Sequence, residues 1–329
     1  MPGVFSPKST VDAVNMKMPV VGLGTWQATD KETEVAISAA IDAGYRHIDT
    51  AYVYMNEAGI GNALEKIMAS GEVKREDLFI VTKLPSFANR PEYVETYLKK
   101  SLTALKLMYV DLYLIHSPVG FVHTDNIGSL ANYTLDYDTD LLKLWKAMEK
   151  QVDAGRAKAI GVSNFNLKQV QRIVENCRIK PANNQVELHI YLQQKELVQY
   201  CKKNGVTVCA YAPLGSPSLS SFTKQIGLST EGMDVLKPME DPVVCEIAKK
   251  HGKSPSQVLL RFMVESGVAV IPKSTNPERI KQNFEIFDFE LTSDEHQRLV
   301  ELDKGPAGRM FNKGFFATLK SHPEYPFEN

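Results

Sequence analysis

One unit repeats along this chain: a short apolar run, followed by a longer segment with helical periodicity. Eight such runs, rich in Val, Ile and Leu, occur in the 329 residues. They are residues 19–24, 46–49, 78–82, 110–116, 157–162, 182–187, 206–211 and 268–271. Their continuous hydrophobicity predicts strands that are buried on both faces, and the long crossovers between them predict a parallel sheet.

The segments between the runs have apolar residues spaced as on one face of a helix. The clearest are residues 32–43, 58–70, 93–105, 141–154, 167–176, 194–203 and 256–266. Four helical segments end in a glycine that leads directly into the next apolar run, at Gly44, Gly155, Gly205 and Gly267. Glycine is favoured there because the residue just past a helix often needs a positive φ.

Eight strand–helix units predict an α/β chain folded as one closed (β/α)8 TIM barrel over residues 1–329. An open, doubly wound sheet is the alternative. The sequence lacks the dinucleotide-binding fingerprint that such a sheet usually carries, because Gln27 stands where the third glycine of G-x-G-x-x-G belongs. The barrel is therefore the favoured fold.

Three long segments fall outside the repeat. Connections 117–139 and 212–241 each follow a strand, so in a barrel both lie as loops on the C-terminal face, where such enzymes carry their chemistry. The Gly- and aromatic-rich tail, residues 303–329, is expected to form a third loop over this mouth. Residues 1–18 are expected to cap the opposite end.

Composition narrows the class of function. The net charge is −1, which gives no electrostatic case for nucleic acid or an anionic membrane surface. No apolar run approaches the roughly 18 residues of a membrane span, and the N-terminus lacks a signal-peptide pattern. The four cysteines form no C-x-x-C pair and the seven histidines form no metal-binding motif. We expect a cytoplasmic protein with free thiols and no metal.

Ionisable residues follow the predicted strands at the end where barrel enzymes act. Asp49, Lys83 and His116 each stand at the end of a run, and Tyr54 comes five residues after Asp49. A lysine there would be desolvated unless paired, and Asp49 is the expected partner. The Lys83 ammonium should lower the pKa of Tyr54 and make that phenol a general acid. His116 could orient a carbonyl oxygen beside it.

Other polar residues also stand at strand ends. These are Thr25, Ser163, Asn164, Gln185, Glu187, Tyr211, Lys273 and Ser274. After the last strand, Pro277 begins a helical stretch with Arg279 in its first turn. Helix N-terminal amides together with Lys273 and Arg279 predict an anion site in the region where TIM barrels usually bind phosphate.

Taken together, these residues resemble the aldo-keto reductase superfamily over nearly the full length of the chain. The resemblance is carried by residues 21–26, 44–51, 56–57, 82–84, 111–116, 161–165, 184–187, 211–215 and 271–274. It implies a barrel that binds NADPH/NADP+ at its mouth and reduces a small-molecule carbonyl compound. It also implies Tyr54 as proton donor, Lys83 and Asp49 as the pair that lowers its pKa, and His116 as the group that orients the substrate.

The resemblance assigns the cofactor contacts as well. Ser163, Asn164 and Gln185 would bind the carboxamide, and Tyr211 would stack on the nicotinamide, with Thr25 and Trp26 nearby. Leu214 and Ser216 would touch the pyrophosphate. Lys273, Ser274, Thr275, Asn276 and Arg279 would hold the 2′-phosphate, and Gln282 and Asn283 the adenine.

The sequence departs from common members of the superfamily at the expected substrate pocket. Ser117 stands where many reductases have Trp, and Pro85 where an aromatic residue is frequent. Both changes predict an emptier pocket wall and hence a bulky apolar carbonyl substrate, such as the 3-dehydroecdysteroids that some insect members reduce. The expected lining is Trp26, Val53, His116, Ser117, Phe121, Phe311 and Phe316.

Two other functions are alternatives. Barrels of this superfamily also serve as lens crystallins or channel-associated subunits, a structural or regulatory role that an intact Asp-Tyr-Lys-His set disfavours. A phosphosugar-handling barrel would leave that set unexplained. A monomer is the default state in the superfamily.

Overall fold

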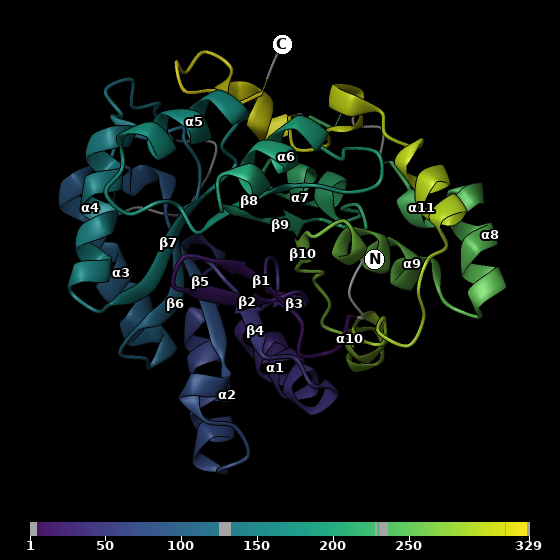
Figure 1. Ribbon diagram of the computed structural model, residues 1–329. Helices are drawn as coiled ribbons and strands as arrows, with labels where there is room; N and C mark the ends of the chain where they lie inside the picture. The colour runs from purple at the N-terminus through teal and green to yellow at the C-terminus, as the bar shows by residue number, and fades with distance from the viewer. Residues whose placement is uncertain (1–4, 125–132, 228, 231–235, 313, 328–329) are drawn as a thin grey trace.

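The structure of the chain is a computed structural model that describes residues 5–124, 133–227, 229–230, 236–312 and 314–327, with backbone alone for 314–316. Its centre is a parallel sheet of eight strands in the order β3 to β10 (Figure 1). The strands are β3 Gly22–Gly24, β4 His47–Asp49, β5 Phe79–Leu84, β6 Val110–Ile115, β7 Ala157–Ser163, β8 Asn183–Glu187, β9 Thr207–Tyr211 and β10 Ala269–Val270. All eight overlap the predicted apolar runs.

The first and last strands meet and close the sheet. Parallel bridges join Val21 to Val270 and Gly24 to Lys273, and the Val270 amide donates to the Val20 carbonyl over 2.8 Å. The predicted (β/α)8 barrel is therefore confirmed, and the alternative of an open sheet is wrong.

Helices surround the barrel in Figure 1. They are α1 Asp30–Ala43, α2 Glu57–Ala69, α3 Pro91–Leu105, α4 Leu141–Asp153, α5 Leu167–Asn176, α6 Lys195–Lys203, α7 Leu219–Gln225, α8 Pro242–His251, α9 Pro255–Glu265, α10 Pro277–Phe284 and α11 Ser293–Val300. Periodicity predicted α1 to α6 and α9, and the helical stretch expected to begin at Pro277 is α10, whereas α7, α8 and α11 were not predicted. Helix α7 and the 3-10 turn Pro238–Glu240 occupy the connection expected to be an irregular loop, so that expectation is wrong in part.

Short 3-10 helices complete the described elements. They are Tyr52–Tyr54, Arg75–Asp77, Ser86–Ala88, Pro238–Glu240, Gly305–Gly308 and Gly314–Leu319. The last two lie in the C-terminal tail. None of the helices in the described ranges is both long enough and apolar enough to cross a membrane.

The four predicted glycine joints all have the left-handed backbone that favours glycine. Their φ angles are 103° at Gly44, 69° at Gly155, 73° at Gly205 and 77° at Gly267. Each glycine lets the chain leave a helix and turn at once into the next strand. This local requirement explains why the joints could be read from sequence.

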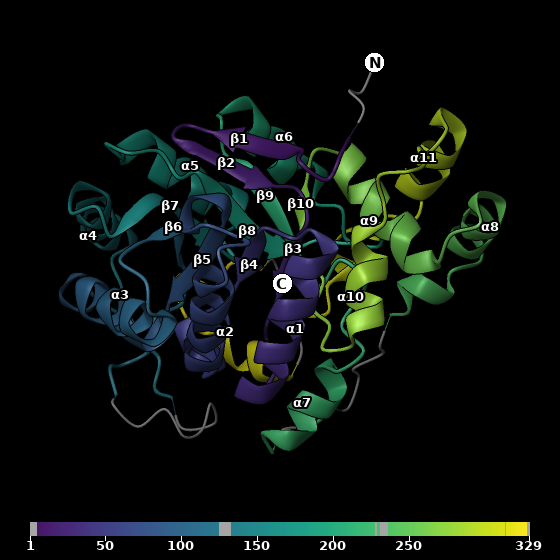
Figure 2. The same cartoon turned by 90° about the horizontal axis from the view of Figure 1, so that it is seen from below.

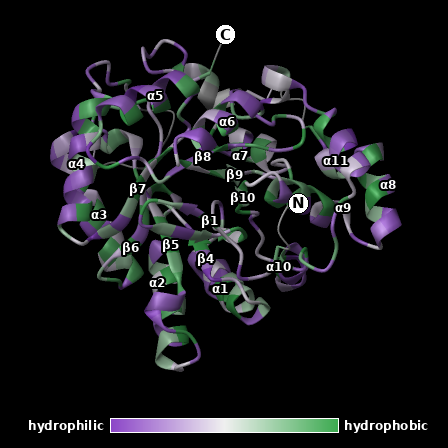
Figure 3. Cartoon of the chain, in the orientation of Figure 1, coloured by the Kyte–Doolittle hydropathy of each residue, from purple (hydrophilic) through white to green (hydrophobic). Residues whose placement is uncertain are grey.

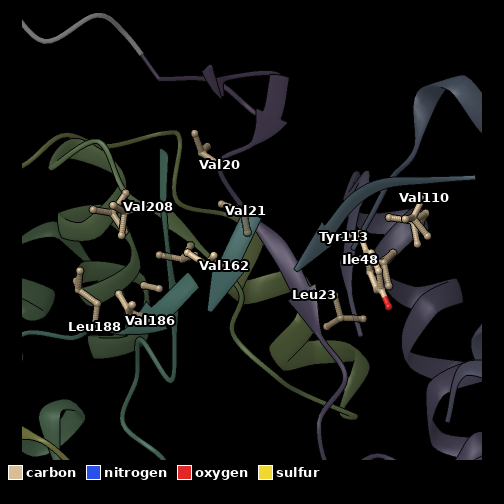
Figure 4. Packing of buried hydrophobic residues seen from close by; sticks show 14 of the residues in the cluster. Val20, Val21, Leu23, Ile48, Val110, Tyr113, Val162, Val186, Leu188 and Val208 are labelled. Carbon is tan, nitrogen blue, oxygen red and sulfur yellow. The ribbon is translucent and has the colours of Figure 1, made fainter. Parts of the chain in front are cut away.

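Two apolar layers hold the barrel together. Side chains on one face of each strand pack under the helices, as Val162, Val186 and Val208 do in Figure 4. Alternate side chains, such as Leu112 and Leu114 of β6, fill the barrel interior. Figure 3 shows hydrophilic residues along outer helices such as α4, as expected for helices with one buried stripe.

A hairpin of β1 (Thr10–Ala13) and β2 (Met16–Pro19) lies at one end of the barrel, and α7 lies at the other (Figure 2). Met16 and Met18 of the hairpin join the apolar cluster inside the barrel. The opposite end is the C-terminal mouth, where the long connections and the tail gather. In the first of these connections, Phe121 bridges to Leu135.

The hairpin should contribute measurably to stability. Met18 is 1% exposed inside the barrel base, so Met18→Ala should lower the free energy of unfolding by roughly 2–5 kcal/mol in a urea titration. Val14→Ala, in the same hairpin at a side chain that is 68% exposed, should cost less than about 0.5 kcal/mol. Equal losses for the two variants would contradict the packing described here.

Candidate active site

A cavity of about 730 Å³ opens among the carboxyl ends of the barrel strands. Every residue predicted to contact a cofactor lines it. These are Thr25, Trp26, Ser163, Asn164, Gln185, Tyr211, Leu214, Ser216, Lys273, Ser274, Thr275, Asn276, Arg279, Gln282 and Asn283. Of the four predicted catalytic residues, Asp49, Tyr54 and His116 line the cavity, whereas Lys83 lies beneath its floor.

Lys83 and Asp49 form an ion pair inside the barrel. Both belong to the inward-pointing positions of their strands, since Ile48 and Ile80 face the outer layer. Lys83 Nζ lies 2.6 Å from Asp49 Oδ1, and the two side chains are 0% and 2% exposed. This is the pairing of Lys83 with Asp49 that we expected from the sequence.

Further hydrogen bonds satisfy this buried pair. Lys83 Nζ also donates to the Thr50 carbonyl over 2.9 Å. The Gln185 amide donates to Asp49 Oδ2 over 2.6 Å, so both carboxylate oxygens are occupied. Burial alone lowers the pKa of Lys83, but the Asp49 carboxylate and Tyr54 outweigh it and the pKa is raised. Lys83 therefore stays charged.

Tyr54 stands over this charge. Lys83 Nζ lies 5.1 Å from the centre of the Tyr54 ring. Burial raises the pKa of Tyr54, Lys83 lowers it and Asp49 raises it, and the net direction is upward. The sequence-based expectation of a lowered pKa has the wrong sign for this structure, because desolvation of the phenolate outweighs the lysine. Tyr54 thus holds its proton at neutral pH, as a proton donor must.

His116 faces Tyr54 across the cavity floor. Their rings lie 5.7 Å apart in an edge-to-face arrangement. Burial, aided by the Lys83 charge, lowers the pKa of His116 to about 3. The imidazole is therefore neutral and can donate one N–H to an oxygen placed beside Tyr54.

A polar network continues from His116 along the wall. The Asn164 amide donates to the His116 carbonyl over 2.8 Å, and the Tyr211 hydroxyl donates to Asn164 Oδ1 over 2.7 Å. Asn164 has a φ of 64°, a conformation uncommon outside glycine. These contacts fix the Tyr211 ring at the cavity wall.

The far end of the cavity has the properties of an anion site. The Asn276 side chain caps helix α10 by accepting from the Arg279 amide over 3.0 Å. Lys273 and Arg279 are both exposed, and neither makes an ion pair with any acidic group in the described residues. Two unpaired cations at a helix N-terminus favour a bound phosphate group.

Aromatic residues line the part of the cavity beside Ser117. Phe121 and Tyr133 stack with ring centres 5.1 Å apart, and Phe87 lies 5.9 Å from Tyr133. Pro85 is buried and does not line the cavity. The expectation that Ser117 and Pro85 leave this wall empty is therefore wrong, because residues from two loops fill it.

A second aromatic group lies across the mouth. Trp26 contacts Phe222 of α7 at 5.0 Å and Phe311 of the tail at 6.0 Å between ring centres. Val53 and Ser117 also line the cavity, as predicted. The side chain of Phe316 lies outside the described residues.

Sequence reasoning missed several lining residues. Among them are Gln27, Ser86, Phe87, Tyr133, Phe222, Leu319, Pro326 and Phe327. Most belong to loops, short 3-10 turns or the tail, whereas Phe222 belongs to α7. No group of three or more His, Cys, Asp or Glu side chains in the described ranges is arranged to hold a metal ion.

Comparison with known proteins gives a consistent result. Residues 20–304 match the aldo/keto reductase family. Aldo-keto reductase family 1 member A1-A of Danio rerio is 45% identical over 292 residues, which cover 88% of this chain and 87% of that protein. Prostaglandin F synthase 1 of Bos taurus is 42% identical over 322 residues, 94% of each. The solved structure of the aldose reductase from Schistosoma japonicum aligns with a TM-score of 0.84 and 40% identity, covering 97% of this chain and 99% of that one.

The depressed pKa of His116 predicts a pH effect on stability. Between about pH 6.5 and pH 3 the unfolded chain binds a proton on this imidazole that the folded chain does not. Unfolding free energy should therefore fall as pH drops through this range, and His116→Gln should reduce the fall. Urea titrations at about pH 7 and about pH 5 measure it. An identical pH dependence in both proteins would show that His116 titrates normally.

Proposed function

The chain belongs to the aldo/keto reductase family, and from this premise we propose that it reduces carbonyl compounds to alcohols with NADPH as the hydride source and Tyr54 as the proton donor. Family members are oxidoreductases that act on small-molecule carbonyls and generally use nicotinamide cofactors. One observation carries the proposal. The buried Asp49–Lys83 pair lies under Tyr54 at one end of a cavity whose other end presents the unpaired Lys273 and Arg279.

The residues around Tyr54 suit proton donation to a carbonyl oxygen. Tyr54 keeps its proton, and neutral His116 donates a hydrogen bond to the same oxygen, so both stabilise the negative charge that develops on it. As Tyr54 loses its proton, the Lys83 ammonium stabilises the phenolate. Bound NADPH would supply the hydride to the carbonyl carbon.

The remaining lining fits the parts of a nicotinamide dinucleotide. The Tyr211 ring offers a flat apolar surface, and Asn164, Ser163 and Gln185 offer amide and hydroxyl groups to a carboxamide. Leu214 and Ser216, which follow β9 in the chain, also line the cavity. Ser274, Thr275 and Asn276 surround the α10 N-terminus, and Gln282 and Asn283 follow within that helix.

The aromatic lining supports a bulky apolar substrate. Phe87, Phe121 and Tyr133 on one side, with Trp26 and Phe311 on the other, offer apolar area that a small aldehyde cannot cover. Burial of that area contributes about 25 cal/mol per Å². We therefore propose a large hydrophobic ketone or aldehyde, steroidal ketones included, as the preferred substrate class.

Tyr54→Phe removes the proposed acid alone. Turnover of an aldehyde should fall by about 10²–10⁴-fold, because general acid catalysis contributes that much, while NADPH binding measured by fluorescence titration should be retained. Tyr137→Phe, at a side chain 58% exposed on the surface, is the matched control and should keep full activity. Near-normal turnover in Tyr54→Phe would disprove the proton-donor assignment.

Arg279→Ala tests the choice of cofactor. A charge-assisted hydrogen bond contributes roughly 1.5–3 kcal/mol, so the KM for NADPH should rise about 10-fold or more while that for NADH hardly changes. Lys281→Ala, at the fourth position after Pro277 in the same helix, is the control, since Lys281 does not line the cavity and its ammonium lies 3.9 Å from Glu285 Oε1. If both cofactors lose affinity equally, Arg279 has a structural role instead.

Phe121→Ala tests the aromatic wall. Loss of the stacked Phe121–Tyr133 pair should raise the KM for a steroidal ketone several-fold and leave the kcat/KM for glyceraldehyde nearly unchanged, since the small substrate does not reach this wall. The measurement is steady-state NADPH oxidation with the two substrates. A parallel loss for both would argue against wall contact.

A further inference from the structure

Glu187 is a buried acid that the proposed chemistry does not use. It ends strand β8, two residues beyond Gln185, and its side chain is 0% exposed. We propose that Glu187 is a positioning residue that docks the C-terminal tail and holds Phe311 against the Tyr211 ring, and so sets the preference for bulky substrates. The kinetic part of this proposal rests on the proposed function, whereas the docking does not.

Both carboxylate oxygens of Glu187 are engaged by the tail. The backbone amide of Met310 donates to Oε1 over 2.7 Å, and that of Phe311 donates to Oε2 over 3.1 Å. Arg309 Nη1 lies 3.9 Å from Oε2, and His189 Nε2 lies 3.1 Å from Oε1. Two of these contacts come from consecutive tail amides, so they fix the register of the tail as well as its position.

A carboxylate is the group that this geometry requires. A buried charge is costly unless hydrogen bonds satisfy it, and the docked tail supplies two. An amide side chain of the same shape has a single acceptor oxygen, so its NH₂ group would face one of the two backbone N–H groups. Glu187→Gln therefore converts one attraction into a repulsion with little change in volume.

The docked amides direct Phe311 into the site. Glu187 and Tyr211 are register partners on β8 and β9. The Phe311 ring packs edge-on against Tyr211, with centres 5.2 Å apart. Tyr211 in turn donates to Asn164, whose amide holds the His116 carbonyl. Glu187 does not line the cavity, so any effect on the reaction must pass through the tail and Tyr211.

The far part of the tail is anchored separately. Asn166, which caps α5, and Gln169 of α5 donate to the carbonyls of Pro326 and Glu324 over 3.0 and 2.9 Å. His322 Nε2 lies 2.8 Å from the Asp136 carbonyl. Loss of the Glu187 contacts should therefore release the Phe311 end of the tail and leave the far end in place.

Chain-wide hydrogen exchange followed by mass spectrometry tests the docking without any substrate. In Glu187→Gln, the amides of Met310 and Phe311 should exchange about 10-fold faster or more, while peptides from the barrel strands should not change. Glu149→Gln is the matched control. Glu149 Oε1 accepts hydrogen bonds from the consecutive amides of Arg178 and Ile179 over 2.7 and 2.8 Å. These two residues precede β8 in the chain and lie away from the mouth. Unchanged exchange at residues 310–311 would overturn the proposal.

Kinetics with a double-variant cycle test the consequence. Glu187→Gln should raise the KM for a steroidal ketone about 10-fold and leave the kcat for glyceraldehyde unchanged. In the Phe311→Ala background, Glu187→Gln should have no further effect on the ratio of kcat/KM for the steroidal ketone to kcat/KM for glyceraldehyde. Equal losses for both substrates, or full additivity with Phe311→Ala, would overturn the positioning role.

Two further variants keep the test decisive. Glu187→Asp retains the charge and should recover part of the slow exchange. If Glu187→Gln fails to fold, Met310→Pro removes one of the two amide donors from the tail side and should shift the substrate ratio in the same direction. A protein that reduces neither substrate contradicts the proposed function, and the exchange result then still decides the docking.

Discussion

The ion pair between Asp49 and Lys83 is the constraint around which this site is built. Two charges inside a barrel cost several kcal/mol in desolvation, so the pair persists only where its geometry and remaining hydrogen bonds are satisfied. Thr50, the residue after β4, and Gln185, on the opposite side of the barrel, complete that set. The order of the strands and the inward register of β4, β5 and β8 are thus tied to one buried interaction.

Two roles at the mouth, the chemistry and the contact with substrate, fall to different groups of residues. The barrel holds the groups that would perform the chemistry, and their pKa values follow from burial as much as from charge. Tyr54 and His116 are both kept in the neutral form by desolvation. The loops and the tail, by contrast, supply the aromatic walls that a substrate would meet. Chemistry and substrate choice thus draw mainly on different parts of the chain, and the contact of Glu187 with the tail links the two.

The sequence predicted what depends on local rules. Strand positions followed from continuous apolar runs, the joints from glycines just past helix ends, and the Asp49–Lys83 pair from the need of a desolvated lysine for a partner at a nearby strand end. The sign of the Tyr54 pKa shift could not be predicted, because desolvation depends on everything packed around the ring. Phe121 was expected in the lining, but Phe87 and Tyr133, which complete its aromatic wall, were missed, because residues of separate loops come together only in the folded chain. The contact of Glu187 with Met310 joins residues more than a hundred positions apart, and no pattern in the sequence marks it.

The most direct test of the central claim follows the hydrogen that reaches the carbonyl carbon. The purified protein would reduce an aldehyde or ketone with NADPH carrying two deuterium atoms at nicotinamide C4, and mass spectrometry would locate the label in the alcohol. The account predicts deuterium on the former carbonyl carbon, and none there when unlabelled NADPH is used in D₂O. Carbon-bound deuterium from D₂O, or an alcohol without label from the deuterated cofactor, would contradict hydride transfer at this site.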